Sequence, residues 1–427
     1  MLMRRALTIA ALLAIAQFVP ASASAQNLAI TNVKIVVGTG QVVDSGTIIV
    51  RDGRIATVTG SSVQIPRGLQ VIDAKGMSAM PGFIDGHKHL ADGPTGKAWM
   101  QSLLEAGYTT VLIGGGAAEA NLSLAKKIES GEYNGPRVIP SGTVALRQTP
   151  LEARMAVQAL AQMGIKHTGE IGLTPEPAPP QAEIEVLKAI VDEAKKVGIQ
   201  VNVHAVSSPA MTAAIDAGVT RLVHLPNKDW TSYEQADAVA KAGAIVAGLI
   251  AFGAPNIDTL SQGPAPVQWP KDNTPRFRDG KAWPEAIVGA NRDAKGRATG
   301  TEGGFTIINA RRIWDADPNH ATISYSTDQN ADDLVVLEHE LKSFSIVFSM
   351  ADIHRIIGPN AARFVGMGDQ IGTLEAGKLA DIILLDGDPT KNIYEMLKTK
   401  VVLKEGTIVV DKRPPATTTG RAPRATR

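Results

Sequence analysis

Apolar runs of strand type alternate with longer runs of helical spacing from Met80 to Met367, and this alternation constrains the fold more than any other feature of the chain. The strand-type runs are predicted at residues 82–87, 109–114, 137–141, 165–170, 199–204, 219–224, 244–250 and 321–328. Consecutive parallel strands need a crossover, which is usually a helix, so eight such runs predict an α/β fold that closes into a TIM-like (β/α)8 barrel. In such barrels ligands and catalytic groups lie at the carboxyl ends of the strands.

Both ends of the chain have a different pattern, because apolar and polar residues alternate there and turn dipeptides such as Asp52-Gly53 separate the runs. This is typical of antiparallel strands. We therefore predict an accessory β-sandwich with an N-terminal part at 26–79 and a C-terminal part at 371–413, flanking the (β/α)8 barrel at 80–370. The tail at 414–427 is rich in Pro, Thr and Arg and is predicted to be disordered.

Residues 1–25 predict a cleaved secretory signal peptide, since two arginines precede an apolar run at 6–19 and small residues follow. That apolar run is too short to span a bilayer comfortably, and no other run approaches the roughly 20 residues that a span needs. We expect an exported protein, periplasmic or secreted, with no membrane span after removal of the signal. The sequence contains no cysteine, which excludes disulfides and thiolate ligands.

The composition limits the partners. The 427 residues carry a formal net charge of +1 and 4% aromatic side chains, which argues against a polyanion partner and against a surface for base stacking. We expect a small-molecule substrate and no nucleic acid. Association into a homo-oligomer is compatible with the sequence.

Six side chains at the ends of the predicted strands are candidates for a metal site: His87, His89, Glu170, His204, His224 and Asp328. Imidazoles and carboxylates together are donors for a divalent cation. His87 and His89 share one face of their strand, because side chains alternate with period two, and Asp85 is expected on that face too. His167 has the opposite orientation from Glu170 and is expected to be a packing residue.

The stretch "PGFIDGHKHL" resembles the first-strand motif PGFID-x-H-x-H of the amidohydrolase superfamily, and "NAARFVGMGDQIGTLEAGKLADIILLD" resembles that family's return into its β-domain. Among its branches the chain is most similar to imidazolonepropionase-like, prolidase-like and enamidase-like enzymes. The resemblance implies a mono- or binuclear metal site. By position, His87 and His89 would hold the first metal and His204 and His224 the second, while Asp328 would be both ligand and base.

The bridging residue on the fourth strand has two candidates. Relatives place either a carbamylated lysine in an "IK" dipeptide, which Lys166 fits, or a glutamate in "GE-x-GL", which Glu170 fits. Glu170 follows Ile165 at the same offset at which His204 follows Ile199, so the register favours Glu170. Lys166 is then expected to be a barrel-interior residue, with a carbamate as the alternative.

These residues predict hydrolysis of an amide-type C–N bond, as in a peptide, an N-acyl amino acid or a lactam, by a metal-activated hydroxide. Two divalent ions are expected, with Zn²⁺ favoured by the histidine-rich donor set and Mn²⁺, Fe²⁺ or Co²⁺ also compatible. One alternative is a lactone or phosphoester hydrolase that uses the same site. Another is a non-catalytic exported barrel that binds a ligand. The Pro- and Trp-containing stretch at 253–301 predicts either a lid or substrate wall, or a surface excursion.

Overall fold

The computed structural model describes residues 26–60, 63–93, 95–251, 300–328 and 332–414. The predicted signal peptide, nearly all of the predicted tail and nearly all of the stretch at 253–301 lie outside the described residues.

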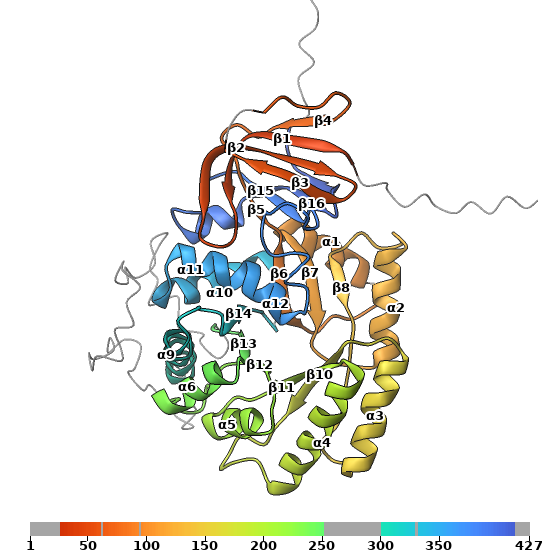
Figure 1. Ribbon diagram of the computed structural model, residues 1–427, viewed down its shortest axis with the longest axis vertical. Coiled ribbons are helices and arrows are strands. Elements are labelled where there is room, and N and C mark those ends of the chain that lie inside the picture. The colour runs from red at the N-terminus through yellow and green to blue at the C-terminus, as the bar shows by residue number, and fades with distance from the viewer. Residues whose placement is uncertain (1–25, 61–62, 94, 252–299, 329–331, 415–427) are drawn as a thin grey trace, which may run out of the picture.

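Strands from both ends of the chain share one eight-stranded sheet, seen as the red and dark blue arrows in Figure 1. These strands are β1 (Leu28–Val36), β2 (Val42–Arg51), β3 (Arg54–Thr59), β4 (Gln70–Asp73), β5 (Ser78–Pro81), β15 (Ile382–Leu385), β16 (Thr399–Lys404) and β17 (Thr407–Asp411). The two halves join where β5 pairs antiparallel with β15 and parallel with β1. The sheet curls back on itself, because the Ile55 N–H donates to the Lys378 carbonyl just before β15. The curled sheet encloses an apolar core of its own, to which Leu28 and Leu384 contribute.

The second unit is the barrel, and every predicted strand-type run contains a parallel strand. The strands are β6 (Phe83–Lys88), β7 (Tyr108–Ile113), β8 (Arg137–Ile139), β9 (Ser141–Gly142), β10 (His167–Gly172), β11 (Gln200–His204), β12 (Arg221–Val223), β13 (Ile245–Gly248) and β14 (Ile323–Tyr325). The third run is divided into β8 and β9 at Pro140, a residue that has no backbone N–H to donate. At the seam between the first and last strands, the Asp328 N–H donates to the His87 carbonyl at 2.9 Å. The predicted (β/α)8 barrel with an accessory β-domain is confirmed.

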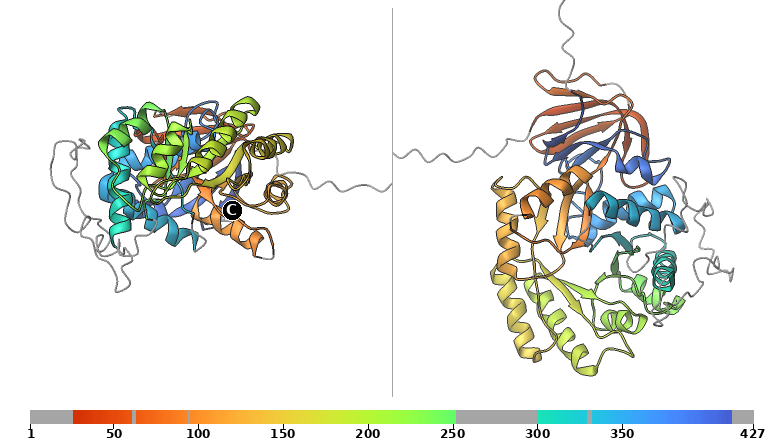
Figure 2. Two further views of the ribbon diagram at one scale, coloured as in Figure 1. Left: turned by 90° about the horizontal axis from the view of Figure 1, so that it is seen from below. Right: turned by 180° about the vertical axis from the view of Figure 1, so that it is seen from behind.

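Helices cover the outside of the barrel (Figures 1 and 2). They are α1 (Gly96–Ala106), α2 (Ala118–Glu129), α3 (Pro150–Gln162), α4 (Gln181–Val197), α5 (Ser208–Asp216), α6 (Tyr233–Lys241), α9 (Gly300–Ala316), α10 (Asp333–Val347), α11 (Met350–Arg355) and α12 (Ala361–Phe364), with a π-turn at Ile356–Asn360 and a 3-10 turn at Ile393–Leu397. Helix α4 shows why they pack there, since it buries Leu187, Ile190 and Val191 on one face and leaves most of its charged residues outside. No helix in the described part of the chain combines the length and apolarity that a membrane crossing requires.

The last residue of α12 and the residue after it lie against the amino end of the barrel. Arg221, the first residue of β12, donates from Nε to the Phe364 carbonyl at 2.9 Å. His167, the first residue of β10, is buried, and its Nε2 lies 3.2 Å from the Val365 carbonyl oxygen. Burial and the nearby Arg221 lower the pKa of His167 to about 3, so this imidazole is neutral. The predicted packing role of His167 is confirmed.

Polar contacts tie the β-domain to the barrel. Arg137 at the start of β8 pairs with Asp381, just before β15, at 2.7 Å. His354 on α11 is buried and places Nε2 3.2 Å from the Pro389 carbonyl oxygen beyond β15. Burial lowers the pKa of His354 to about 4. The β-domain therefore makes specific bonds to the end of the barrel that lies away from the candidate site.

Candidate metal centre

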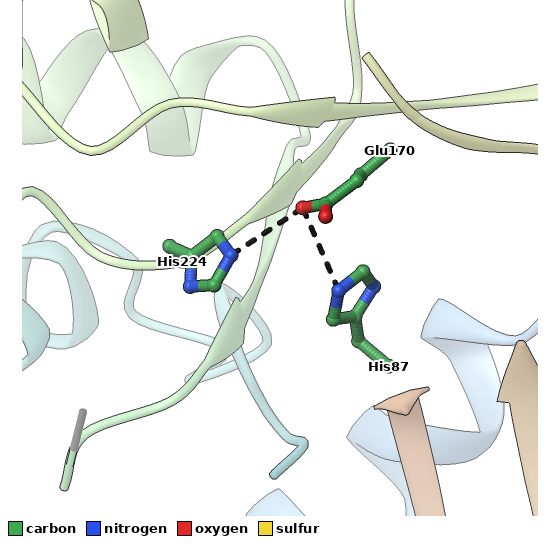
Figure 3. A group of neighbouring side chains, drawn as sticks. All are labelled: His87, Glu170 and His224. Carbon is green, nitrogen blue, oxygen red and sulfur yellow. Dashed lines mark ion pairs between the residues drawn. The ribbon is translucent and has the colours of Figure 1, made fainter. Parts of the chain in front are cut away.

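Glu170 lies at the centre of the predicted ligands, near the end of β10. Its Oε1 is 3.2 Å from His89 Nε2, while its Oε2 is 2.8 Å from His204 Nδ1 and 3.4 Å from His224 Nε2. Figure 3 shows the carboxylate between the rings of His87 and His224. Oε1 thus faces His89 of the first strand, whereas Oε2 faces His204 and His224 of the fifth and sixth strands and also lies 3.6 Å from His87 Nε2.

Asp328 completes the group from the last strand. Its Oδ1 lies 3.4 Å from His87 Nε2 and 3.2 Å from His89 Nε2. Two sets of donor atoms are compact enough for one ion each, with all atoms of a set within 4.8 Å: His87, Glu170 and His224 form one set, and His87, His89 and Asp328 form the other. All six side chains that the sequence predicted as ligands therefore converge at the carboxyl ends of the barrel strands.

Two of these residues have a backbone conformation that side chains other than glycine seldom adopt. The φ angle is +67° at His224 and +54° at Asp328. Each such conformer costs on the order of 1 kcal/mol and persists where the surroundings impose it, most often at functional sites. Here the imposing bonds are visible, because the His224 N–H donates to the Ala247 carbonyl and the Asp328 N–H donates to the His87 carbonyl.

Glycines after β7 lie against the first two imidazoles. A Cβ atom at Gly114 would lie 2.5 Å from the ring of His87, and one at Gly115 would lie 3.5 Å from the ring of His89. The first distance is shorter than any real carbon contact, so a side chain at position 114 would displace His87. Gly114 is thus a steric requirement of the site, whereas a Cβ at Gly115 would make an ordinary contact.

The electrostatics of the group are those of an anionic site lined by imidazoles. Burial would raise the pKa of Glu170, but hydrogen bonding to His204, His224 and His89 outweighs burial and holds that pKa well below its usual range. Burial opposes ionisation of Asp328 as well, and His87 and His89 lower its pKa by more. In return Asp328 and, next, Glu170 raise the pKa of His89 to about 10. Both carboxylates are ionised at neutral pH and are stabilised by positive charge.

The donor set fits a divalent cation. His87 is buried and its Nε2 makes no hydrogen bond within the described part of the chain, although it points toward Asp328 and Glu170 at 3.4 and 3.6 Å. A buried polar atom without a hydrogen bond is rare in folded proteins and calls for an explanation. A cation between His87 and the carboxylates would supply the missing partner, and neutral imidazole with carboxylate oxygen is a donor set that zinc accepts.

The structure corrects two expectations. Lys166 is exposed and precedes β10, which begins at His167, so it is not a barrel-interior residue. The Asp85 carboxylate faces Thr327 whereas the His87 ring faces Asp328, and the register of β6 against β7 shifts between Asp85 and Lys88. The Asp85 carboxylate accepts a hydrogen bond from the Thr327 hydroxyl at 2.6 Å.

Comparison with known proteins places these features in a family. The sequence profile of the Amidohydrolase family matches residues 78–244 and 303–409. A deacetylase of Agrobacterium fabrum is 43% identical over 96 residues, which are 22% of this chain and 23% of that protein. An enamidase of Eubacterium barkeri is 29% identical over 163 residues, which are 33% of this chain and 42% of the enamidase. The chain thus matches less than half the length of these curated relatives.

Solved structures share the fold over nearly the whole chain. A putative prolidase from Bifidobacterium longum superposes with a TM-score of 0.70 at 22% identity and covers 92% of this chain and 97% of its own. A Xaa-Pro dipeptidase gives 0.68 at 19% identity, with 90% and 99% covered. The two segments that match the family profile make up more than half of the sequence and contain all six converging side chains. The chain belongs to the amidohydrolase family.

Proposed function

We propose that the protein is a metal-dependent hydrolase that cleaves an amide-type C–N bond in a small molecule such as a peptide, an N-acyl amino acid or a lactam. The observation that carries this proposal is the convergence of four imidazoles and two carboxylates at the carboxyl end of the barrel. Membership of the amidohydrolase family supports the reaction class, and the substrates named for the relatives suggest the bond type.

The proposed ligands are the six residues of the site, with two divalent cations, Zn²⁺ being the first candidate. His87 and His89 would serve one ion, and His204 and His224 the other. Glu170 is the proposed bridge, because its Oε1 faces His89 and its Oε2 faces His204. When bound, such cations lower the pKa of a water molecule toward neutrality and polarise a carbonyl oxygen.

Asp328 is the proposed general base. Its pKa is held low by His87 and His89, so the carboxylate is ionised at neutral pH and can accept a proton from the attacking water. The same carboxyl group can return that proton to the departing nitrogen, which would otherwise leave as an unstable anion. The hydrogen bond from the Asp328 N–H to the His87 carbonyl fixes the backbone from which this carboxylate projects.

The direction of substrate entry follows from the exposure of the imidazoles. The side chains of His87 and His224 are 2% exposed, whereas those of His89 and His204 are 40% and 31% exposed. We propose that the substrate approaches from the side of His89 and His204. His87 and His224 then form the dry floor of the site, where electrostatic interactions are strongest.

The test is elemental analysis of the purified protein, together with hydrolysis assays on N-acyl amino acids, dipeptides, lactams and lactones. We expect about two divalent ions per chain and turnover of at least one amide substrate that a chelator abolishes and Zn²⁺ restores. Turnover that is unaffected by full metal removal would contradict the mechanism. A metal-loaded protein that is inert on the whole panel would favour a ligand-binding role, and turnover of lactones alone would favour the ester alternative.

We also propose that the protein is exported, on the basis of the signal-like composition of residues 1–25. Expression of the full chain in a Gram-negative host, followed by osmotic release and N-terminal sequencing, tests this. We expect periplasmic protein that begins at Gln26. An intact N-terminus on cytosolic protein would contradict export.

A further inference from the structure

A buried ionic network lies behind the first ligand strand, between β6 and the helices α1 and α10. Lys88, which separates the two ligand histidines, is 1% exposed and pairs with Asp333, also 1% exposed, at 3.3 Å. The indole of Trp99 donates to the same Asp333 oxygen at 3.2 Å, and the Lys88 ammonium lies 5.7 Å from the centre of the Trp99 ring. Strand β6 is thereby bonded to the first residue of α10 and to α1.

The network also reaches the strand that carries Asp328. The Lys88 ammonium donates to the Thr327 hydroxyl at 3.3 Å, and that hydroxyl donates to Asp85 Oδ2 at 2.6 Å. The other Asp85 oxygen accepts from the backbone N–H of Thr327 and from that of His87, each at 3.1 Å. A single carboxylate thus holds the backbone on both sides of the seam between β6 and β14, next to a ligand on each side.

The free-energy cost of burying these ions suggests that the network does more than stabilise the fold. Removing a lysine and two aspartates from water costs several kcal/mol for each ion, and a buried ion pair rarely improves stability over apolar residues of the same size. What such a pair supplies is a defined position, because the bonds of Asp85 and Lys88 are directional. Here Asp85 and Lys88 fix the positions of the two segments that meet where the barrel closes. These segments carry His87, His89 and Asp328, which must face the same ions.

We propose that Lys88 is a positioning residue of the metal centre: through Asp333 and Thr327 it fixes the seam between β6 and β14, and so the separation between the His87–His89 pair and Asp328. This inference rests on the proposed function, because it assigns the network to the same metal site. Lys88 itself does not touch the ions. Partners that orient metal ligands in this way typically contribute about 10- to 100-fold in affinity or activity.

The mildest test compares two threonine-to-valine variants, one at either side of β14. Thr327→Val keeps the shape of the side chain and removes the hydroxyl that joins Lys88 and Asp85. Thr322→Val is the matched control, since Thr322 is also buried and donates to the Ile313 carbonyl at 2.9 Å, at the opposite end of β14. Co²⁺ binding is followed by visible absorption, and thermal unfolding and kinetics are measured in parallel. We expect Thr327→Val to weaken Co²⁺ binding about 10-fold and to lower kcat about 10-fold with little change in KM.

Thr322→Val should lose thermal stability by a similar amount while keeping Co²⁺ affinity, the Co²⁺ spectrum and kcat. Equal behaviour of the two variants in Co²⁺ affinity and kcat would overturn the inference, because only a general effect of losing a buried hydroxyl would remain.

A second pair separates position from stability. Lys88→Met leaves Asp333 buried without its cation, so it should lower the unfolding temperature as well as Co²⁺ affinity and kcat. In Lys88→Met/Asp333→Asn the uncompensated charge is gone, and we expect stability to recover while Co²⁺ affinity and kcat stay about 10-fold low. If the unfolding temperature, Co²⁺ affinity and kcat all recover together, Lys88 and Asp333 form only a structural pair, and the inference is overturned.

The wild-type protein in the same series distinguishes this inference from the function on which it rests. Wild-type protein that binds Co²⁺ and hydrolyses a substrate, beside variants that match it in Co²⁺ affinity and kcat, would refute the role of Lys88 alone. Wild-type protein that binds no Co²⁺ would refute the metal centre and the positioning role together.

Discussion

Buried histidines occur at both ends of this barrel, and the two groups differ in their partners. His87 and His224 at the mouth and His167 and His354 at the opposite end are each 2% exposed. At the mouth the rings face two ionised carboxylates, whereas at the other end each ring faces a backbone carbonyl. A carbonyl stabilises a neutral imidazole that donates, but a pair of carboxylates needs positive charge, which a metal ion can supply. Burial therefore does not identify a ligand histidine, and the chemistry of its partner does.

The largest effect is expected at the mouth. Asp328→Asn removes one of the two charges and the proposed base, so kcat/KM should fall by about 10²–10⁴-fold. His354→Gln is a polar substitution at the opposite end of the barrel. It should keep kcat/KM within about twofold, because a substitution far from the site leaves the site intact. Steady-state kinetics of the two variants check this, and an Asp328→Asn enzyme with near-normal turnover would contradict the assignment of the base.

Metal removal should also change the stability of variants at the two ends of the barrel by different amounts. A ligand present at about 100 times its Kd stabilises the folded state by about 2.7 kcal/mol, so a chelator should lower the unfolding temperature of the wild type. The same shift is expected for His354→Gln, and a much smaller one for His87→Ala, which has lost a shared ligand. Calorimetry with and without chelator measures it. A full chelator shift in His87→Ala would place the bound metal elsewhere.

Acid should destabilise the protein through the end away from the site. The pKa of His354 is about 4 in the folded protein, below the ordinary value of 6.5. Between these values the unfolded chain binds the extra proton, so stability falls as the pH falls from 6.5 toward 4, by up to about 3 kcal/mol. His354→Gln cannot be protonated and should show a shallower decline in urea unfolding over that range. Parallel declines in the two proteins would contradict a neutral, buried His354.

The smallest effect is expected at Lys166. This side chain is exposed outside the site, so Lys166→Ala should change the free energy of unfolding by less than about 0.5 kcal/mol and leave kcat/KM unchanged. Added bicarbonate should have no influence on either protein. A large loss of activity that bicarbonate modulates would instead assign the bridge to a carbamate on Lys166, against Glu170.

The sequence was sufficient for the strands and for the convergence of the six candidate ligands, because both follow local rules. Each predicted strand-type run contains a strand, and the ligand residues stand at similar offsets from the start of their runs. At this spacing the barrel geometry brings the side chains to one level without further information. The resemblance of "PGFIDGHKHL" to a known motif identified the first pair in addition.

The remainder depends on tertiary contacts that no local pattern encodes. The register shift between Asp85 and Lys88 arises from the pairing of β6 with β7, and the break between β8 and β9 from Pro140 in its sheet context. An acidic partner for Lys88 could be expected from the sequence. A lysine between two inward-facing residues of a buried strand points toward the helices and needs a carboxylate there. Its partner Asp333 follows a stretch of sequence with no strand-like or motif pattern, so only the fold could reveal it.

The pairing of β5 with β15 affects the order in which parts of the chain can fold. β6, which carries the first imidazoles, begins at Phe83, two residues after β5 ends, and Met80 of β5 is held by Ile383 of β15. About 300 residues separate these partners along the chain, so the base of β6 gains this support only after β15 has been synthesised. Because contacts between such distant residues carry a large cost in loop-closure entropy, we expect the strand that bears His87 to gain its full support late in folding.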